Sequence, residues 1–351
     1  MYSYNKLFTL LSLFAILYLS GQRGFQVEGR KTKHAPKKLF VFGDSYCDTG
    51  NIKKALANSW KYPYGITFPG KPVGRFSDGR VFADYLAKHL KLKSPIPFNL
   101  RKVAPKQQKF GINFAFGGTG AFDTLVRGPN LTTQIDSFEK LIKYKQYDVS
   151  DLKNSVALVS VAGNDYSYYL TTTNGSYTGI PSFIASLVNQ TTIDLIRLKK
   201  LGVKKIVVDG LQPFGCLPTA TALSSFKQCN GTANAIASLH NTLLTQSVAK
   251  LNQQNKDHPS FIILNFYDAF LTVLENPSKH NIENPLKPCC AGVSSEYNCG
   301  SVDNNNVKKY TVCDNPKKAF FWDAVHPTQA GWHAVFHELK STKALHQILH
   351  N

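Results

Sequence analysis

The chain has 351 residues, 43% of them hydrophobic, and a formal net charge of +19 at pH 7. This length and apolar fraction allow a sizeable packed core and exclude a disordered or low-complexity chain. The basic balance would suit solubility, an anionic surface or an acidic polymer, and no motif of a nucleic-acid-binding fold accompanies it, so we do not expect nucleic acid as a partner.

A short apolar run over residues 7–19 opens the chain, and small residues follow it. The run is too short to span a bilayer comfortably, and the pattern predicts a secretory signal peptide over residues 1–29. Cleavage after Gly21 and cleavage after Gly29 both remain open, and an N-terminal anchor is the alternative. A basic arm would then occupy residues 30–37, and we expect no integral membrane segment in the mature protein.

Sequons and cysteines give independent support for secretion. Four N-x-S/T sequons are candidate glycosylation sites: Asn130, Asn174, Asn189 and Asn230. Seven cysteines in an oxidising compartment would form disulfides and leave one thiol free. Cys47 is the candidate for that thiol because it follows a buried strand.

The first strand-like run covers residues 39–42 and stops at Gly43, and Asp44 and Ser45 follow at once. Active sites of open α/β sheets lie at the carboxyl ends of such strands, so Ser45 is a candidate nucleophile. The nucleophile elbow of the α/β-hydrolases needs Gly-x-Ser-x-Gly, and Cys47 stands where its second glycine would be. An aromatic, glycine-rich loop follows and enters a helix near Ser77, which could cap it.

Two more apolar runs end in the same way. One begins at Gly111 and leads into Gly117 and Gly118, a loop type that can present bare backbone N–H groups to an anion. The other covers residues 155–161 and leads to Asn164, whose amide would be free to donate at the sheet edge.

Helices over residues 182–201 and 233–251 alternate with strands over residues 205–209 and 261–266. The five strands with their intervening helices predict one α/β domain, a three-layer α/β/α sandwich on a five-stranded parallel sheet. Its expected bounds are residues 38–343, with a C-terminal tail over residues 344–351.

The remaining cysteines fall into two groups. Cys216 and Cys229 would close a loop of about a dozen residues, and we expect a disulfide between them. Disulfides and a zinc site compete for the later group, and the Cys-x-x-Cys spacing of zinc sites is missing there. This later group comprises Cys289, Cys290, Cys299 and Cys313. A bridge between the two adjacent cysteines would be strained, so two pairings stay open.

Asp323 and His326 lie three positions apart near the C-terminus. This spacing lets a carboxylate accept from one ring nitrogen and leaves the other to take a proton from a serine. His333 and His337 share a helix face further on, but they lack the glutamate of the H-E-x-x-H motif. We therefore expect surface or packing histidines there, and no metal.

Four blocks, in this order, resemble the GDSL, or SGNH, family of plant secreted esterases and lipases. They are Gly43-Asp44-Ser45, Asn113-x-Ala115-x-Gly117-Gly118, Asn164-Asp165 and Asp323-x-x-His326. The chain departs from the family pattern at Tyr46, where a leucine is usual, and at Ala162, where a glycine is usual.

The resemblance implies a secreted ester hydrolase of the cell wall or apoplast that needs no cofactor. It implies that Ser45 attacks the ester, that His326 is general base and acid, and that Asp323 orients it. The oxyanion donors would be the N–H groups of Ser45 and Gly118 and the amide of Asn164. Esters of lipids, acylated polysaccharides or small alcohols are the expected substrates, and an anionic cell-wall polymer would suit the basic surface. An acyltransferase and an inactive binding protein of the same fold are the alternatives.

Overall fold

The computed structural model describes residues 35–161, 163–253 and 259–349, which belong to one compact unit. The expected signal peptide, most of the basic arm and Ala162 therefore lie outside the described residues. In the part of the chain that is described, no helix has the length and apolar character needed to cross a membrane.

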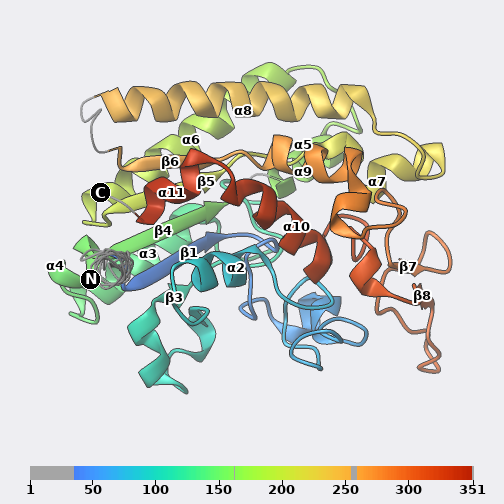
Figure 1. Cartoon of the computed structure of the whole chain (residues 1–351), viewed down its shortest axis with the longest axis horizontal. Coiled ribbons are helices and arrows are strands. Elements are labelled where there is room, and N and C mark those ends of the chain that lie inside the picture. Colours follow the sequence, from blue (N-terminus) through green and yellow to red (C-terminus); the bar gives the residue numbers. More distant parts are fainter. Residues whose placement is uncertain (1–34, 162, 254–258, 350–351) are drawn as a thin grey trace, which may run out of the picture. The chain divides into compact units, whose positions relative to one another are not determined.

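A parallel sheet of six strands in the order β2-β3-β1-β4-β5-β6 forms the centre of the fold (Figure 1). The strands are β1 (Lys38–Gly43), β2 (Ile96–Pro97), β3 (Ile112–Asn113), β4 (Ser155–Ser160), β5 (Lys205–Asp209) and β6 (Phe261–Leu264). The predicted parallel sandwich is confirmed, with six strands in place of five. The additional strand, β2, is two residues long, contains a proline and pairs only with β3. No apolar run in the sequence therefore indicates it.

Helices cover both faces of the sheet, because successive side chains of each buried strand point to opposite faces. In β1, Leu39 and Val41 pack in one apolar cluster, whereas Phe40 and Phe42 pack in the other. The first cluster includes α2 (Phe82–His89), α9 (Phe266–Glu275), α10 (Gln329–Lys340) and α11 (Lys343–Leu349). The second includes α3 (Leu131–Lys143), α6 (Ile180–Lys200) and α8 (Gly231–Asn252). The remaining α-helices of the described residues are α4 (Val149–Lys153), α5 (Gly163–Thr172) and α7 (Pro218–Thr221).

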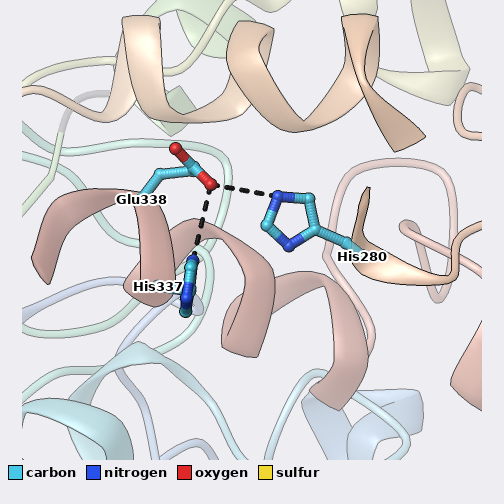
Figure 2. A group of neighbouring side chains, drawn as sticks. All are labelled: His280, His337 and Glu338. Carbon is cyan, nitrogen blue, oxygen red and sulfur yellow. Dashed lines mark ion pairs between the residues drawn. The ribbon is translucent and has the colours of Figure 1, made fainter. Parts of the chain in front are cut away.

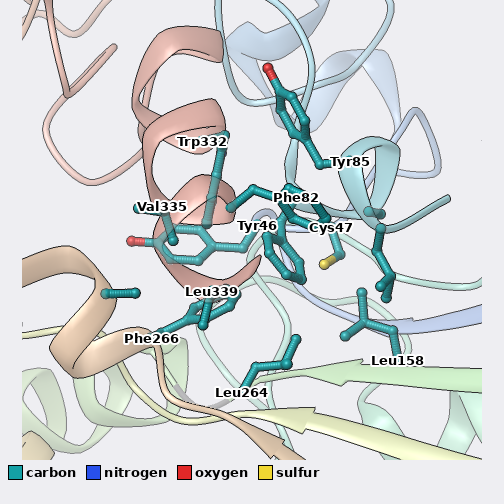
Figure 3. Close-up of a cluster of buried hydrophobic side chains, with 14 of the residues drawn as sticks. Tyr46, Cys47, Phe82, Tyr85, Leu158, Leu264, Phe266, Trp332, Val335 and Leu339 are labelled. Atoms are coloured by element: carbon teal, nitrogen blue, oxygen red, sulfur yellow. The ribbon is translucent and has the colours of Figure 1, made fainter. Parts of the chain in front are cut away.

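The first cluster lies directly behind the nucleophile candidate. Figure 3 shows Tyr46 and Cys47 among side chains of α2 and α10, with Trp332 beside them. Helix α10 begins after Thr328, whose hydroxyl accepts from the N–H of Gly331 at 2.8 Å. Its buried residues recur at helical spacing: Trp332, Val335, Phe336 and Leu339.

Two local expectations differ from the structure. Helix α2 begins at Phe82, not near Ser77, because the hydroxyl of Ser77 donates to the carbonyl of Pro327 at 3.0 Å and is not a helix cap. The expected tail forms helix α11, in which Leu345 and Ile348 are buried against the first cluster. The packed domain therefore continues past residue 343.

All three disulfides lie outside the sheet. Cys216 pairs with Cys229, and the later cysteines pair as Cys289–Cys313 and Cys290–Cys299. Cys47 carries the free thiol and is fully buried. The later pairs frame a two-stranded antiparallel ladder of β7 (Cys290–Gly292) and β8 (Tyr310–Val312). Tyr64 and Trp322 pack in the same apolar cluster as three of these cysteines.

Candidate active site

Ser45 lies in a tight turn at the carboxyl end of β1. The turn is closed by the carbonyl of Asp44, which accepts from the N–H groups of Cys47 at 3.1 Å and Asp48 at 2.9 Å. Gly43 allows this turn because its φ is +143° and a Cβ there would lie 2.0 Å from the carbonyl oxygen of Ser160 on β4. Ser45 itself is only 8% exposed.

The structure brings Ser45, His326 and Asp323 into one chain of contacts. The Oγ of Ser45 lies 2.8 Å from Nε2 of His326, and Nδ1 of His326 lies 2.8 Å from Oδ1 of Asp323. Oδ1 of Asp323 also accepts from the N–H groups of Val325 and His326 at 3.0 and 2.9 Å. This is the arrangement in which a histidine can take a proton from a serine while a carboxylate holds its tautomer.

Tyr64 supports Asp323 from a distant loop. Its hydroxyl donates to Oδ2 of Asp323 at 2.7 Å. Burial would raise the pKa of Asp323, but the charge of His326 and the hydrogen bonds from His326, Val325 and Tyr64 hold that pKa below its ordinary value. Asp323 is therefore ionised at neutral pH. Sequence reasoning missed Tyr64, and only its place in the aromatic loop after Ser45 could have drawn attention to it.

Two aromatic rings fix the imidazole from the sides. The ring centroid of Phe76 lies 5.0 Å from that of His326, and that of Tyr46 lies 5.8 Å away. The hydroxyl of Tyr46 donates to the carbonyl of Val325 at 2.7 Å. Tyr46 stands at the position where a leucine was expected, and its hydroxyl connects the Ser45 turn to the His326 loop.

The candidate oxyanion donors differ in whether they line the cavity that contains Ser45. Asn164 lines the same cavity as Ser45 and His326, and its amide donates to the carbonyl of Thr119 at 2.9 Å. An amide nitrogen has two hydrogens, so one stays available. Gly118, next to Thr119, is not among the residues that line this cavity. Within the described residues, the backbone N–H groups of Ser45 and Gly118 have no hydrogen-bond partner.

Three buried aspartates hold the loops of the site, two of them across separate loops and Asp44 within its own turn, and the sequence reasoning missed their roles. Asp48 accepts from the N–H of Gly117 at 2.9 Å as well as from its own turn, and Asp165 accepts from the N–H groups of Ala121 and Phe122. Burial raises the pKa of each of these two carboxyls to about 6. Asp44 accepts from the N–H of Tyr46 at 3.0 Å, and burial raises its pKa to about 7 against the opposing effects of that bond and of His326.

A cavity of about 350 Å³ opens beside Ser45 and His326. Much of its wall is apolar, with contributions from Tyr166, Leu170, Ile180, Phe214, Leu217 and Ile236. Asp209 and Gln212 are among the buried polar side chains that also line it. Asp209 accepts from the hydroxyl of Ser160 at 2.6 Å. Gln212 is 7% exposed, and its carboxamide has no hydrogen-bond partner within the described residues. A wall of this kind suits an apolar group with one hydrogen-bonding substituent.

The sequons lie at different depths. Asn174, Asn189 and Asn230 are exposed, whereas Asn130 is half-buried and its amide donates to Asp123 at 2.8 Å. Asn130 and Asn230 also cap α3 and α8 through their side-chain oxygens.

Comparison with known proteins decides the family. The family model of GDSL-like lipase/acylhydrolases matches residues 39–339. The chain belongs to this family. Among its relatives, a GDSL esterase/lipase of Arabidopsis thaliana is 54% identical over 348 residues, covering 96% of each chain. A second from Arabidopsis thaliana is 47% identical over 350 residues, covering 97% of this chain and 98% of the relative. Acetylajmalan esterase 2 of Rauvolfia serpentina is 32% identical over 325 residues, covering 83% of this chain and 86% of the relative.

Membership of the GDSL family makes this protein a carboxylic ester hydrolase of the SGNH type. The family match spans all four blocks that the sequence analysis singled out, from the Ser45 turn to the His326 loop.

Proposed function

We propose that this protein is a secreted esterase that uses Ser45 as nucleophile and holds the apolar part of its substrate in the cavity beside that serine. The observation that carries the proposal is the unbroken chain from Ser45 through His326 to Asp323, with distances of 2.8 Å at both joints, at the edge of a largely apolar cavity.

The reaction proceeds through an acyl-enzyme. Nε2 of His326 takes the proton of Ser45 as Oγ attacks the carbonyl carbon of the ester. His326 then gives this proton to the leaving alkoxide, and the alcohol departs. A water molecule, deprotonated by the same nitrogen, attacks the acyl group and restores the serine. Asp323 stays ionised throughout, because its hydrogen bonds and His326 keep its pKa low.

Negative charge that develops on the carbonyl oxygen would be stabilised by hydrogen-bond donors of the protein. The unpartnered N–H groups of Ser45 and Gly118 and the second hydrogen of the Asn164 amide are the proposed donors. Such donors are effective because they need no reorganisation when the charge develops.

The side chains of the cavity wall indicate which kind of ester would bind. An acyl chain or another apolar group of moderate size would lie against the hydrophobic side chains, and a hydroxyl or carbonyl group on it would bond to Gln212. One relative is named an acetylajmalan esterase, which keeps small acylated compounds among the candidates.

Secretion is supported by the N-terminal apolar run, by the three disulfides and by the three exposed sequons. Expression of the full chain in plant cells tests this part. We expect the protein in the extracellular fluid, with an N-terminus that follows Gly21 or Gly29. Retention of residues 1–20 in a membrane fraction would contradict it.

A fluorophosphonate probe on the purified mature protein tests the catalytic proposal, because the probe reacts with serines that a base activates. Peptide mapping should find the label on Ser45. Ser45→Ala should abolish labelling and turnover of a short p-nitrophenyl ester while the melting curve stays the same, since one small hydroxyl carries little stability. A native protein that is not labelled, or is labelled on another serine, would contradict the assignment and favour an inactive binding protein.

A further inference from the structure

Three potential metal ligands meet on the side of the domain that carries α10. His280 ends the 3-10 helix η8 (Pro277–His280), and His337 and Glu338 lie in the last turn of α10. Figure 2 shows the two imidazole rings, from separate elements, both directed at the Glu338 carboxylate. None of the three lines the cavity beside Ser45.

The donor atoms lie close enough together to share one ion. Nε2 of His280 lies 3.0 Å from Oε1 of Glu338, and Nδ1 of His337 lies 3.5 Å from the same oxygen. All three atoms lie within 4.8 Å of one another. Ligands at about 2.0–2.2 Å from a tetrahedral zinc ion are roughly 3.3–3.6 Å apart, so the two contacts of Glu338 are already close to the separation that a shared ion needs.

The His280 nitrogen gives a second, independent indication. Nε2 is buried and makes no hydrogen bond within the described residues, although Oε1 of Glu338 is 3.0 Å away. The carboxylate is thus close to the nitrogen without lying where an N–H could donate to it. A buried ring nitrogen without a hydrogen bond is costly, and a cation between nitrogen and oxygen would satisfy both.

We propose that His280, His337 and Glu338 bind one divalent transition-metal ion, with Zn²⁺ as the best match. Two imidazole nitrogens and one carboxylate oxygen form a donor set of the borderline type that zinc prefers, and water would complete a tetrahedron. The His280 side chain is 10% exposed and Glu338 is 25% exposed, whereas His337 is 67% exposed. Solvent and metal therefore reach the site past His337.

The ion would link two elements that are separate in sequence. Helix α10 packs its apolar face into the first cluster, and η8 follows α9 on the same side of the sheet. A metal that joins η8 to α10 stabilises the folded state by an amount that grows with the free metal concentration relative to Kd, because the three ligands are not held together in the unfolded chain. The site is structural, so ester hydrolysis should not depend on it.

Zinc titration of the mature, disulfide-bonded protein tests the proposal. The affinity tag is removed first, the protein is stripped with EDTA, and ZnCl₂ is added in a calorimeter and in parallel melting curves. We expect one Zn²⁺ per chain and a higher melting temperature. CaCl₂ should produce neither effect, because calcium prefers oxygen ligands.

Variants assign the site. His280→Ala and Glu338→Gln should each weaken zinc binding by at least about 10-fold, since loss even of a supporting partner typically costs 10- to 100-fold. His333→Ala is the matched control: it removes a histidine one turn earlier on α10, and zinc affinity should not change. If His280→Ala does not fold, the exposed His337→Ala provides the same test.

Two results would overturn the proposal: no stoichiometric zinc binding by the wild type, or binding that is equally tight in His280→Ala, His337→Ala and Glu338→Gln. Turnover of a p-nitrophenyl ester should be the same before and after EDTA treatment. A loss of turnover with zinc removal would contradict the structural role given to the ion.

Discussion

The hydroxyl of Tyr64 donates a 2.7 Å hydrogen bond to Oδ2 of Asp323, across 259 positions of sequence. The other oxygen of Asp323 accepts the backbone N–H groups of the histidine loop, and both oxygens lie within 2.9 Å of Nδ1 of His326. Tyr64 also packs beside Cys289, Cys290 and Cys299, so the disulfide-bonded loop supports Asp323 through it.

Tyr64→Phe keeps the ring and removes only this hydrogen bond. A hydrogen bond to a charged group contributes about 1.5–3 kcal/mol, so we expect kcat to fall by roughly 10-fold or more while KM changes little. The pKa of Asp323 should rise, since this bond helps to lower it. Steady-state kinetics measure the loss, and Tyr62→Phe, which alters an exposed tyrosine on the same loop, is the control. Equal kcat in wild type and Tyr64→Phe would show that Asp323 does not need Tyr64.

The oxyanion assignment predicts a loss in kcat at Asn164. Removing one donor typically costs about 100- to 1,000-fold in kcat, and KM should change little because the donor acts mainly on the transition state. Asn164→Ala should show this loss. Asn164→Asp should be at least as damaging, because it sets an acceptor and a charge against the oxyanion and against the Thr119 carbonyl. If Asn164→Ala lowers kcat by less than roughly 10-fold, Asn164 is not an oxyanion donor, and the N–H of Gly118 contributes more of the stabilisation.

The raised pKa of Asp44 predicts that the free energy of unfolding depends on pH. Its pKa in the folded protein is about 7, against 3.8 as the ordinary value, so the folded state holds a proton that the unfolded state releases. The stability that this group contributes is full below about pH 4 and is lost as the pH rises to about 7. Asp44→Asn does not titrate, so its free energy of unfolding relative to the wild type should increase over this interval and then level off. Urea unfolding of both proteins between about pH 4 and pH 8 measures the difference. A constant difference would refute the raised pKa.

The position of Gln212 in the cavity wall predicts a preference for esters that carry a polar group. Gln212→Leu keeps a similar volume and removes the unpaired carboxamide from the cavity wall. A hydrogen bond contributes about 0.5–1.5 kcal/mol, so kcat/KM for an ester with a hydroxylated acyl chain should fall by about 3- to 10-fold. The unsubstituted ester of the same length is the control and should be hydrolysed at least as well as by the wild type. Equal losses for both esters would mean that Gln212 does not recognise a polar group.

Much of the sheet could be predicted because its signals are local. The apolar runs of β1, β4 and β5 are buried on both faces, so each appears as a continuous hydrophobic stretch, and the predicted bounds of β1 and β5 differ from the observed ones by no more than one residue. The edge strand β2 has no such run, because two residues at the border of the sheet need little apolar surface. Leu345 and Ile348 were missed for a related reason: α11 is short, and its burial depends on the sheet against which it packs.

Asp323 and His326 are three residues apart, so one tight loop is enough to join them, and their pairing could be read from the sequence. The contact of His326 with Ser45 spans 281 positions, and that of Tyr64 with Asp323 spans 259. Only the family resemblance suggested the first, and nothing suggested the second. The pairing of the four late cysteines, the exposure of Gln212 to the cavity and the meeting of His280 with Glu338 are of the same kind. Each depends on how the packed sheet positions loops that are distant in sequence. Residue type and spacing along the chain do not specify that geometry.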